Sequence, residues 1–205
     1  GDVTIVNDDD INIASSNVRG NMTARATRND KEEAGTLTIS GTSIFTTSQS
    51  DADITLGSVN VFTGAVALNT SGSTGHAVVD NDGTTALIIG VSTVGGNLTL
   101  TSGAAAGITD SDNVTVTGNL IATTNANSGV INMGTLKVDG TMALTTDGDG
   151  DATVVNMDDT IDFANSTVRG ALNATATTGD MTDTGSLTVT STSSFTTSAT
   201  DADIK

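Results

Sequence analysis

The sequence contains no cysteine, no proline, no tryptophan and no tyrosine, and its four phenylalanines are the only aromatic residues among 205. Without cysteine, neither a disulfide framework nor a thiolate zinc site can form. The absence of proline favours strands that are paired on both sides, because proline lacks the N–H that a sheet ladder needs. Also missing are the tryptophan and tyrosine rings on which sugars stack, and the aromatic platforms that bind single-stranded nucleic acids.

Basic residues are scarce too, with 7 of them against 24 acidic residues and a formal net charge of -17. A polyanion would be repelled by this chain, which excludes DNA and RNA as expected partners. The sequence has no signal peptide and no run of 18 or more apolar residues, so we expect no membrane insertion in this segment. The composition is that of a soluble, acidic chain with a narrow core of small aliphatic residues.

What the sequence does contain is a repeat of itself. Residues 8–54 and 158–204 align about 150 residues apart, with Val18-Arg19-Gly20 matching Val168-Arg169-Gly170. A half-length copy lies between them, because residues 92–99 match residues 166–173. Such self-similarity is typical of stacked, solenoid architectures.

The half-length copy predicts a unit of about 75 residues, equal to three coils, within one continuous domain that spans residues 1–205. Each end of the chain falls within a coil, so we expect the chain to be a piece of a longer array. The predicted units are 36–112 and 113–185, with partial units 1–35 and 186–205.

Short segments of the form apolar-x-apolar recur along the whole chain every 22–29 residues. This alternation indicates strands with one buried face, and no stretch has the 3.6-residue period of an amphipathic helix. We therefore predict an all-β, parallel β-solenoid of about eight coils with three short strands per coil. The segments that define the coils are Ile11/Ile13, Leu37/Ile39, Val59/Val61, Leu87/Ile89, Val114/Val116, Leu136/Val138, Ile161/Phe163 and Leu187/Val189.

The runs at residues 96–103, 113–120 and 186–190 resemble the degenerate repeats of large bacterial exoproteins. Those are the filamentous-haemagglutinin-like adhesins of two-partner secretion and the passenger domains of autotransporters. The resemblance implies a right-handed parallel β-helix that is displayed outside the cell, at the cell surface, as a fibre or stalk. It implies no catalytic residue.

These observations favour a non-catalytic, extracellular structural or adhesive solenoid that needs no cofactor. We expect such a rod to associate end to end or edge to edge into fibres, with a cell-surface or polysaccharide ligand as a further partner. The alternative is a β-helix polysaccharide lyase or hydrolase, or a calcium-stabilised carbohydrate-binding module. Asp158 and Asp159 could serve as paired catalytic carboxylates, but the equivalent turn positions are acidic as well. His76, the only histidine, has no nearby nucleophile pattern and is expected to be a solvated turn residue.

Aspartates gather in the predicted turns, where carboxylate and carbonyl oxygens could bind Ca²⁺. The loop with Asp147, Asp149 and Asp151 is the best single candidate for a calcium site. The other candidate ligands are Asp80, Asp82, Asp158 and Asp159. The alternative is that these side chains only stabilise turns through local hydrogen bonds.

Three further surface features are open to interpretation. Asn21, Asn97 and Asn173 begin Asn-x-Ser/Thr sequences at related positions of the repeat, which makes them candidate glycosylation sites. Outward threonines and Asn60 along the first strands suggest an ice-binding column, which Lys137 and Asp162 interrupt. The stretch 25–33 is rich in charged residues, whereas the matching stretch of the second copy has few. It is therefore a candidate contact with a partner.

Overall fold

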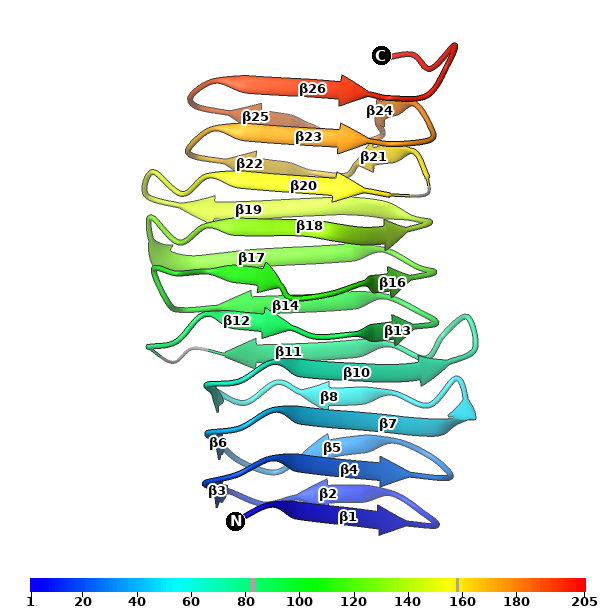
Figure 1. Cartoon of the computed structure of the whole chain (residues 1–205), viewed down its shortest axis with the longest axis vertical. Helices are drawn as coiled ribbons and strands as arrows, with labels where there is room; N and C mark the ends of the chain where they lie inside the picture. Colours follow the sequence, from blue (N-terminus) through cyan, green and yellow to red (C-terminus); the bar gives the residue numbers. More distant parts are fainter. Residues whose placement is uncertain (82–83, 158) are drawn as a thin grey trace.

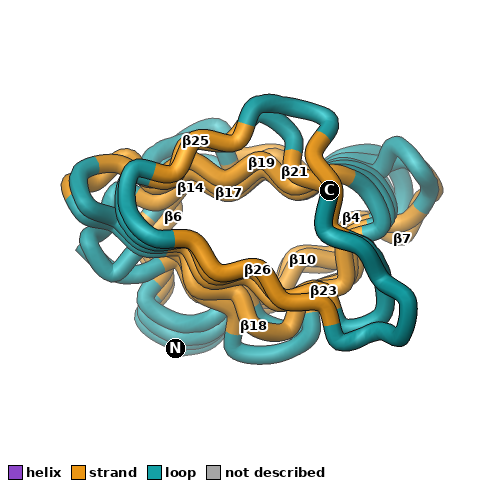
Figure 2. Tube along the Cα trace, turned by 90° about the horizontal axis from the view of Figure 1, so that it is seen from above, coloured by secondary structure: helices purple, strands orange, loops and turns teal. Residues whose placement is uncertain are grey.

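The computed structural model describes residues 1–81, 84–157 and 159–205. The chain winds as a right-handed coil: in Figure 1 it crosses the near side from left to right, returns behind, and rises with each turn. Viewed along its axis, the coils superimpose, and two long walls of strands face each other (Figure 2). The predicted all-β parallel solenoid is confirmed. In the described residues, no helix is long and apolar enough to span a membrane.

Two large parallel sheets and one small sheet make up the walls. Sheet A has 12 strands: β1 (Val3–Asn7), β4 (Met22–Ala26), β7 (Ser43–Ser50), β10 (Val66–Ser71), β12 (Leu87–Ile89), β13 (Ser92–Val94), β15 (Ile108–Asp110), β16 (Val114–Val116), β18 (Ile131–Val138), β20 (Ala152–Asn156), β23 (Leu172–Ala176) and β26 (Ser193–Thr197). Sheet B has 11 strands: β2 (Ile11–Ile13), β5 (Lys31–Glu33), β8 (Ile54–Leu56), β11 (Ala77–Asn81), β14 (Leu98–Ser102), β17 (Leu120–Asn127), β19 (Thr141–Asp147), β21 (Ile161–Phe163), β22 (Ser166–Val168), β24 (Met181–Asp183) and β25 (Leu187–Val189). Sheet C has three: β3 (Ser16–Val18), β6 (Leu37–Ile39) and β9 (Val61–Phe62).

The coils are shorter and more numerous than the sequence predicts. Ten strands follow one another along the main path of sheet A, so the chain makes about nine turns rather than eight. For strand residues that pair between successive coils, the sequence separation is smallest for Val3 and Met22 and largest for Asn69 and Thr93. The predicted spacing between coils is too long because the segments chosen to define it are not equivalent: β12 pairs with β15, whereas β16 pairs with β13.

The number of strands per coil changes along the rod. The first three coils each have three strands, one in each sheet, as predicted, although β7 is eight residues long. In the middle of the rod, the longer strand β18 pairs with both β15 and β16, and β19 pairs with both β21 and β22. One long strand therefore spans the positions that two short strands occupy in a neighbouring coil.

The repeat of about 150 residues and its half-length copy relate to the coils in different ways. The two distant copies, at the N-terminal and C-terminal ends of the chain, occupy the same side of the rod, since β2 and its counterpart β21 both lie in sheet B. The half-length copies do not, because β13 lies in sheet A and its counterpart β22 lies in sheet B. The step from one distant copy to the other thus covers seven turns, and the half-length unit covers three and a half turns rather than three.

The core is a single stack of inward aliphatic side chains with aromatic pairs near its ends. Phe45 and Phe62 meet edge to face with ring centroids 6.2 Å apart, and Phe163 and Phe195 meet in the same way at 6.3 Å. Inward residues alternate with outward ones along each strand, as in β14, where Leu98 and Leu100 are buried. Leucine, isoleucine, valine and alanine make up most of this narrow interior.

Candidate functional site

The most continuous polar feature is a ladder of side-chain acceptors at the corner that precedes the strands of sheet B. At this corner, each side chain accepts the backbone N–H of the equivalent residue in the next coil. The bonds run from Asp53 N to Asp30 Oδ1 (2.9 Å), His76 N to Asp53 Oδ1 (2.7 Å), Asn97 N to His76 Nδ1 (2.8 Å), Asn119 N to Asn97 Oδ1 (2.9 Å) and Thr141 N to Asn119 Oδ1 (2.9 Å). We call these residues the corner ladder.

His76 is therefore not the solvated turn residue that the sequence predicts. Its ring is half-buried, and its Nδ1 accepts a backbone hydrogen bond at a position where other coils have Asp or Asn. A Cβ atom at Gly96 would lie only 2.4 Å from His76 Nδ1, so the backbone of the next coil packs directly against the ring. The histidine serves the same structural purpose as the carboxylates and amides around it.

A shorter version of this ladder precedes the strands of sheet A. Asp2 Oδ1 accepts the N–H of Asn21 at 2.8 Å, and Asn21 Oδ1 accepts the N–H of Thr42 at 2.9 Å. In the second copy, Asp151 Oδ1 accepts the N–H of Ala171 at 2.7 Å. These turn side chains thus join adjacent coils, rather than forming only the local bonds within one turn that the sequence predicts.

The predicted calcium ligands make different contacts in the structure. Asp151 binds a backbone N–H, Asp147 lies 4.0 Å from the Arg169 guanidinium, and Asp149 is exposed. Asp159 accepts the N–H of Thr160 at 2.7 Å. Across residues 1–81, 84–157 and 159–205, no group of three acidic or histidine side chains is placed to hold a metal ion.

The remaining calcium candidates are Asp80, Asp82 and Asp158. Asp80 is half-buried on β11; burial is the main cause that raises the pKa of Glu33, and the charge of Asp80 adds to it. Asp82 and Asp158 lie outside the described residues. A calcium site at any of these aspartates stays a prediction.

The three candidate glycosylation sites are not structurally equivalent. Asn21 precedes β4 of sheet A, Asn97 precedes β14 of sheet B, and Asn173 is the second residue of β23. Asn21 and Asn97 use their Oδ1 atoms in the ladders, whereas Asn173 is exposed on the outer face of sheet A. Asn21 and Asn97 correspond through the half-turn repeat, whereas the counterpart of Asn173 in the first copy is Thr23. Glycosylation stays a prediction at each asparagine.

Buried asparagines and serines form a second set of cross-coil bonds that the sequence analysis missed. Asn156 Oδ1 accepts the N–H of Val138 at 2.8 Å, while its Nδ2 donates to the carbonyls of Val138 and Thr160. Ser166 Oγ accepts the N–H of Leu144 at 3.1 Å. These side chains satisfy backbone groups of the adjacent coil that the strand ladder leaves without a partner. Their inward position in the alternating pattern is the signal that could have identified them. The other members are Asn60, Asn81 and Ser92.

The outward column considered for ice binding does not form, because Asn60 is fully buried and Thr38, Thr115 and Thr188 lie in three different sheets. The structure shows a different column on the outer face of sheet B, formed by in-register Thr101, Thr123, Thr145, Thr167 and Thr188. A shallow, open groove follows part of this column and is bounded by Asp147 and Arg169.

The charged stretch 25–33 is divided between surface and core. Arg25 and Arg28 are exposed, but the Lys31 side chain is completely buried. Glu33 Oε1 accepts the N–H of Ser58 and, at 3.0 Å, an N–H of the Asn60 amide. Burial raises the pKa of the Glu33 carboxyl above its usual value of 4.5, although these hydrogen bonds oppose the effect. The stretch as a whole is therefore not a continuous partner-facing surface.

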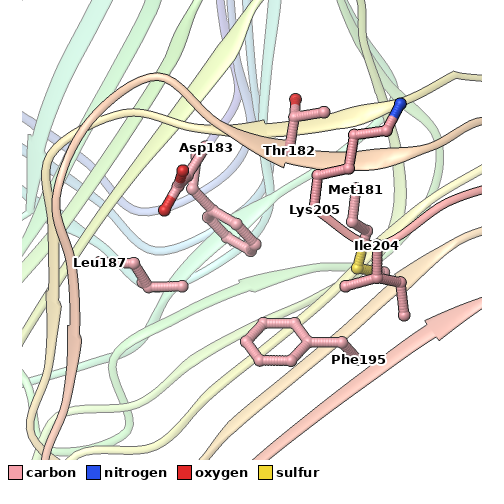
Figure 3. A pocket seen from close by; sticks show the side chains of 8 residues that line it. Met181, Thr182, Asp183, Leu187, Phe195, Ile204 and Lys205 are labelled. Atoms are coloured by element: carbon pink, nitrogen blue, oxygen red, sulfur yellow. The ribbon is translucent and has the colours of Figure 1, made fainter.

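A hollow lies at the C-terminal end of the core. Met181, Leu187, Phe195 and Ile204 line it, with Asp183 and Lys205 at its rim (Figure 3). Its lining is mostly the inward face of the last coil. The hollow is a continuation of the core and holds no arrangement of nucleophile and base among the residues that line it.

Comparison with known proteins agrees with the repeat. No curated protein and no solved structure matches the chain. A family model described as repeats of unknown function (DUF5649) matches residues 1–69 and 149–205, which contain the two distant copies of the repeat. Because these segments together make up more than half of the chain, the protein belongs to this family of repeats.

Proposed function

We propose that this chain is a non-catalytic structural segment, a stiff extracellular rod that forms part of a surface stalk or filament. One observation carries the proposal: cross-coil hydrogen bonds from both backbone and side chains continue through successive coils along the rod. Each coil contacts only its neighbours, so such a structure extends in one dimension. Among the candidate site residues, Asp151, Asn21 and Asn97 take part in these cross-coil bonds, which supports a structural role.

The shape and stiffness of the rod can be tested directly. Small-angle X-ray scattering of the purified chain should give a pair-distance distribution skewed toward long distances, as for a cylinder. A symmetrical distribution would contradict the proposal.

Antibody labelling of intact cells, compared with labelling of permeabilised cells, tests the extracellular location. Signal that requires permeabilisation would exclude it.

We also propose end-to-end association of such rods. Val3 and Ile5 at one end, and Leu187, Val189 and Phe195 at the other, are the core residues that remain only partly buried. Covering them with another coil would remove apolar surface from water and complete the backbone ladder. Sedimentation velocity over a hundredfold range of concentration should show growing, elongated species. A sedimentation coefficient that stays at the monomer value over this range would indicate that only a coil of the same chain can cover these ends.

A polysaccharide contact is a second candidate function, favoured by the threonine column on sheet B. Hydroxyls that recur at the strand spacing of ~4.8 Å present a regular row of donors and acceptors along the rod. Arg169 and Asp147 flank this row. A glycan array screened with the wild type and a Thr123→Val/Thr145→Val/Thr167→Val variant tests the idea. Equal signals from the two proteins would exclude this surface.

A further inference from the structure

Lys31 is a cation placed in a position that the fold otherwise fills with an apolar side chain. It is the first residue of β5 and points inward, with 0% of its surface exposed. In the sheet it lies between Ile11 of β2 and Ile54 of β8, both of which are buried. The equivalent residue of the second copy is Met181 of β24, which is 2% exposed. The same interior position is thus apolar in one copy and basic in the other.

The Lys31 amine has no compensating partner among the described residues. Its Nζ atom makes no hydrogen bond although it is shielded from solvent. Burial of an ammonium without a partner is unfavourable, so it shifts the amine toward its neutral form relative to water.

None of the acidic groups described on the neighbouring elements forms a hydrogen bond with the Lys31 amine. On β5 itself, Glu32 faces outward, and Glu33 binds Ser58 and Asn60 through Oε1 while its Oε2 is buried without a hydrogen-bond partner. Before β8, Asp53 accepts the N–H of His76, and before β5, Asp30 accepts the N–H of Asp53. Before β2, Asp10 is exposed.

The direction of the pH effect follows from this burial. Burial lowers the pKa of the Lys31 amine from 10.5 to about 8. Above pH 10.5 the amine is neutral in both the closed and the opened chain, so its burial opposes closure least. As the pH falls from 10.5 toward 8, the opened chain takes up a proton that the closed chain does not bind. The closed form is therefore progressively weakened, and below pH 8 the full penalty is present.

We propose that Lys31 makes the segment from β1 to β5 a proton-sensitive strap, which opens locally when the amine takes up a proton. Opening moves the charged side chain into water and uncovers the edges of β7 and β8, to which these strands are paired. The matching coils of the second copy have Met181 at this position and stay closed over the same pH range. The two copies of the repeat thus differ in stability because of one side chain.

Hydrogen exchange measured by mass spectrometry tests this difference within one molecule. After correction for the intrinsic exchange rate, protection of residues 22–33 should rise on the order of tenfold from pH 7 to pH 9.5. Protection of residues 172–183, the matching segment, should stay unchanged. A rise of equal size in both segments, or in neither, would overturn the proposal.

Reciprocal substitutions provide the matched controls. Lys31→Met should make the protection of residues 22–33 independent of pH, and Met181→Lys should transfer the pH dependence to residues 172–183. Because Met181→Lys could unfold the last coils, NMR of the lysine side chains gives a second measurement on the unaltered chain. A Lys31 amine that titrates near 10.5 would contradict the proposal, whereas titration near 8 supports it.

Discussion

The backbone N–H of Asn97 donates a hydrogen bond to Nδ1 of His76 over 2.8 Å, so the only histidine of the chain occupies a position that other coils give to Asp or Asn. An asparagine should be able to replace this histidine, because Asn97 makes the equivalent bond to the next coil. We expect His76→Asn to change the free energy of unfolding by less than about 0.5 kcal/mol.

His76→Leu is the matched variant, since it removes the acceptor and leaves the Asn97 N–H unpaired. We expect it to cost about 1 kcal/mol, measured by urea denaturation at neutral pH. If the leucine and asparagine variants had the same midpoint, the corner ladder would contribute nothing measurable at this coil.

Asn156 and Asn7 are equivalent residues of the two copies, and they offer a test of the buried amides. Asn156→Ala leaves the N–H and carbonyl of Val138 and the carbonyl of Thr160 without their side-chain partner, so we expect a loss of about 3 kcal/mol. Asn7 is exposed and donates only to the carbonyl of Asp10, so Asn7→Ala should cost less than about 1 kcal/mol. Denaturation midpoints that fall equally in both variants would show that burial does not set the cost.

Gly107 combines a positive φ of 68° with the shortest contact that an added Cβ would make at any described glycine. A Cβ there would lie 1.7 Å from the carbonyl oxygen of Val130, and backbone cannot move aside as a side chain can. We expect Gly107→Ala to destabilise the rod by at least about 2 kcal/mol in thermal unfolding. Gly134→Ala is the control, because nothing lies within 4 Å of its added Cβ, and it should change stability by less than about 0.5 kcal/mol.

Glu33 predicts a pH dependence in the acid range. Burial raises the pKa of its carboxyl above 4.5, so the folded chain binds this proton more tightly than the unfolded chain. The stabilising effect is full below pH 4.5 and is lost as the pH rises from 4.5 through the folded-state pKa.

Glu33→Gln should remove this part of the pH profile and raise stability at pH 7, because no charge is then buried. Urea midpoints between pH 4 and pH 7 check this expectation. Glu32→Gln, on the outward side of the same strand, is the control and should leave the shape of the profile unchanged. Parallel profiles for the wild type and Glu33→Gln would contradict the expected role of burial.

The fold could be predicted because two independent patterns agree in this chain. Period-two alternation identifies strands, as in Leu98 and Leu100, and the internal repeat identifies stacking. The coil length was predicted less well, since an apolar pair such as Leu87 and Ile89 shows that a strand exists but not which neighbour it pairs with. Pairing depends on contacts between residues in successive coils, such as Val3 with Met22, which local alternation does not report.

The candidate sites could be predicted only in part, for a related reason. Acidic turn residues are visible in the sequence, but whether Asp151 binds an ion or a backbone N–H depends on the next coil. The sequence places Lys31 in a charged surface stretch because its neighbours are charged. Its alignment with Met181 was the signal that it points inward.

The half-turn relation between β13 and β22 affects how such a chain can lengthen during evolution. Duplication of one half-length unit would add three and a half turns, so everything downstream would be rotated to the opposite side of the rod. Duplication of two such units together would add seven turns and preserve the facing of every downstream side chain. Duplications of different lengths would therefore change the side of the rod on which a downstream surface lies, without altering any residue in that surface.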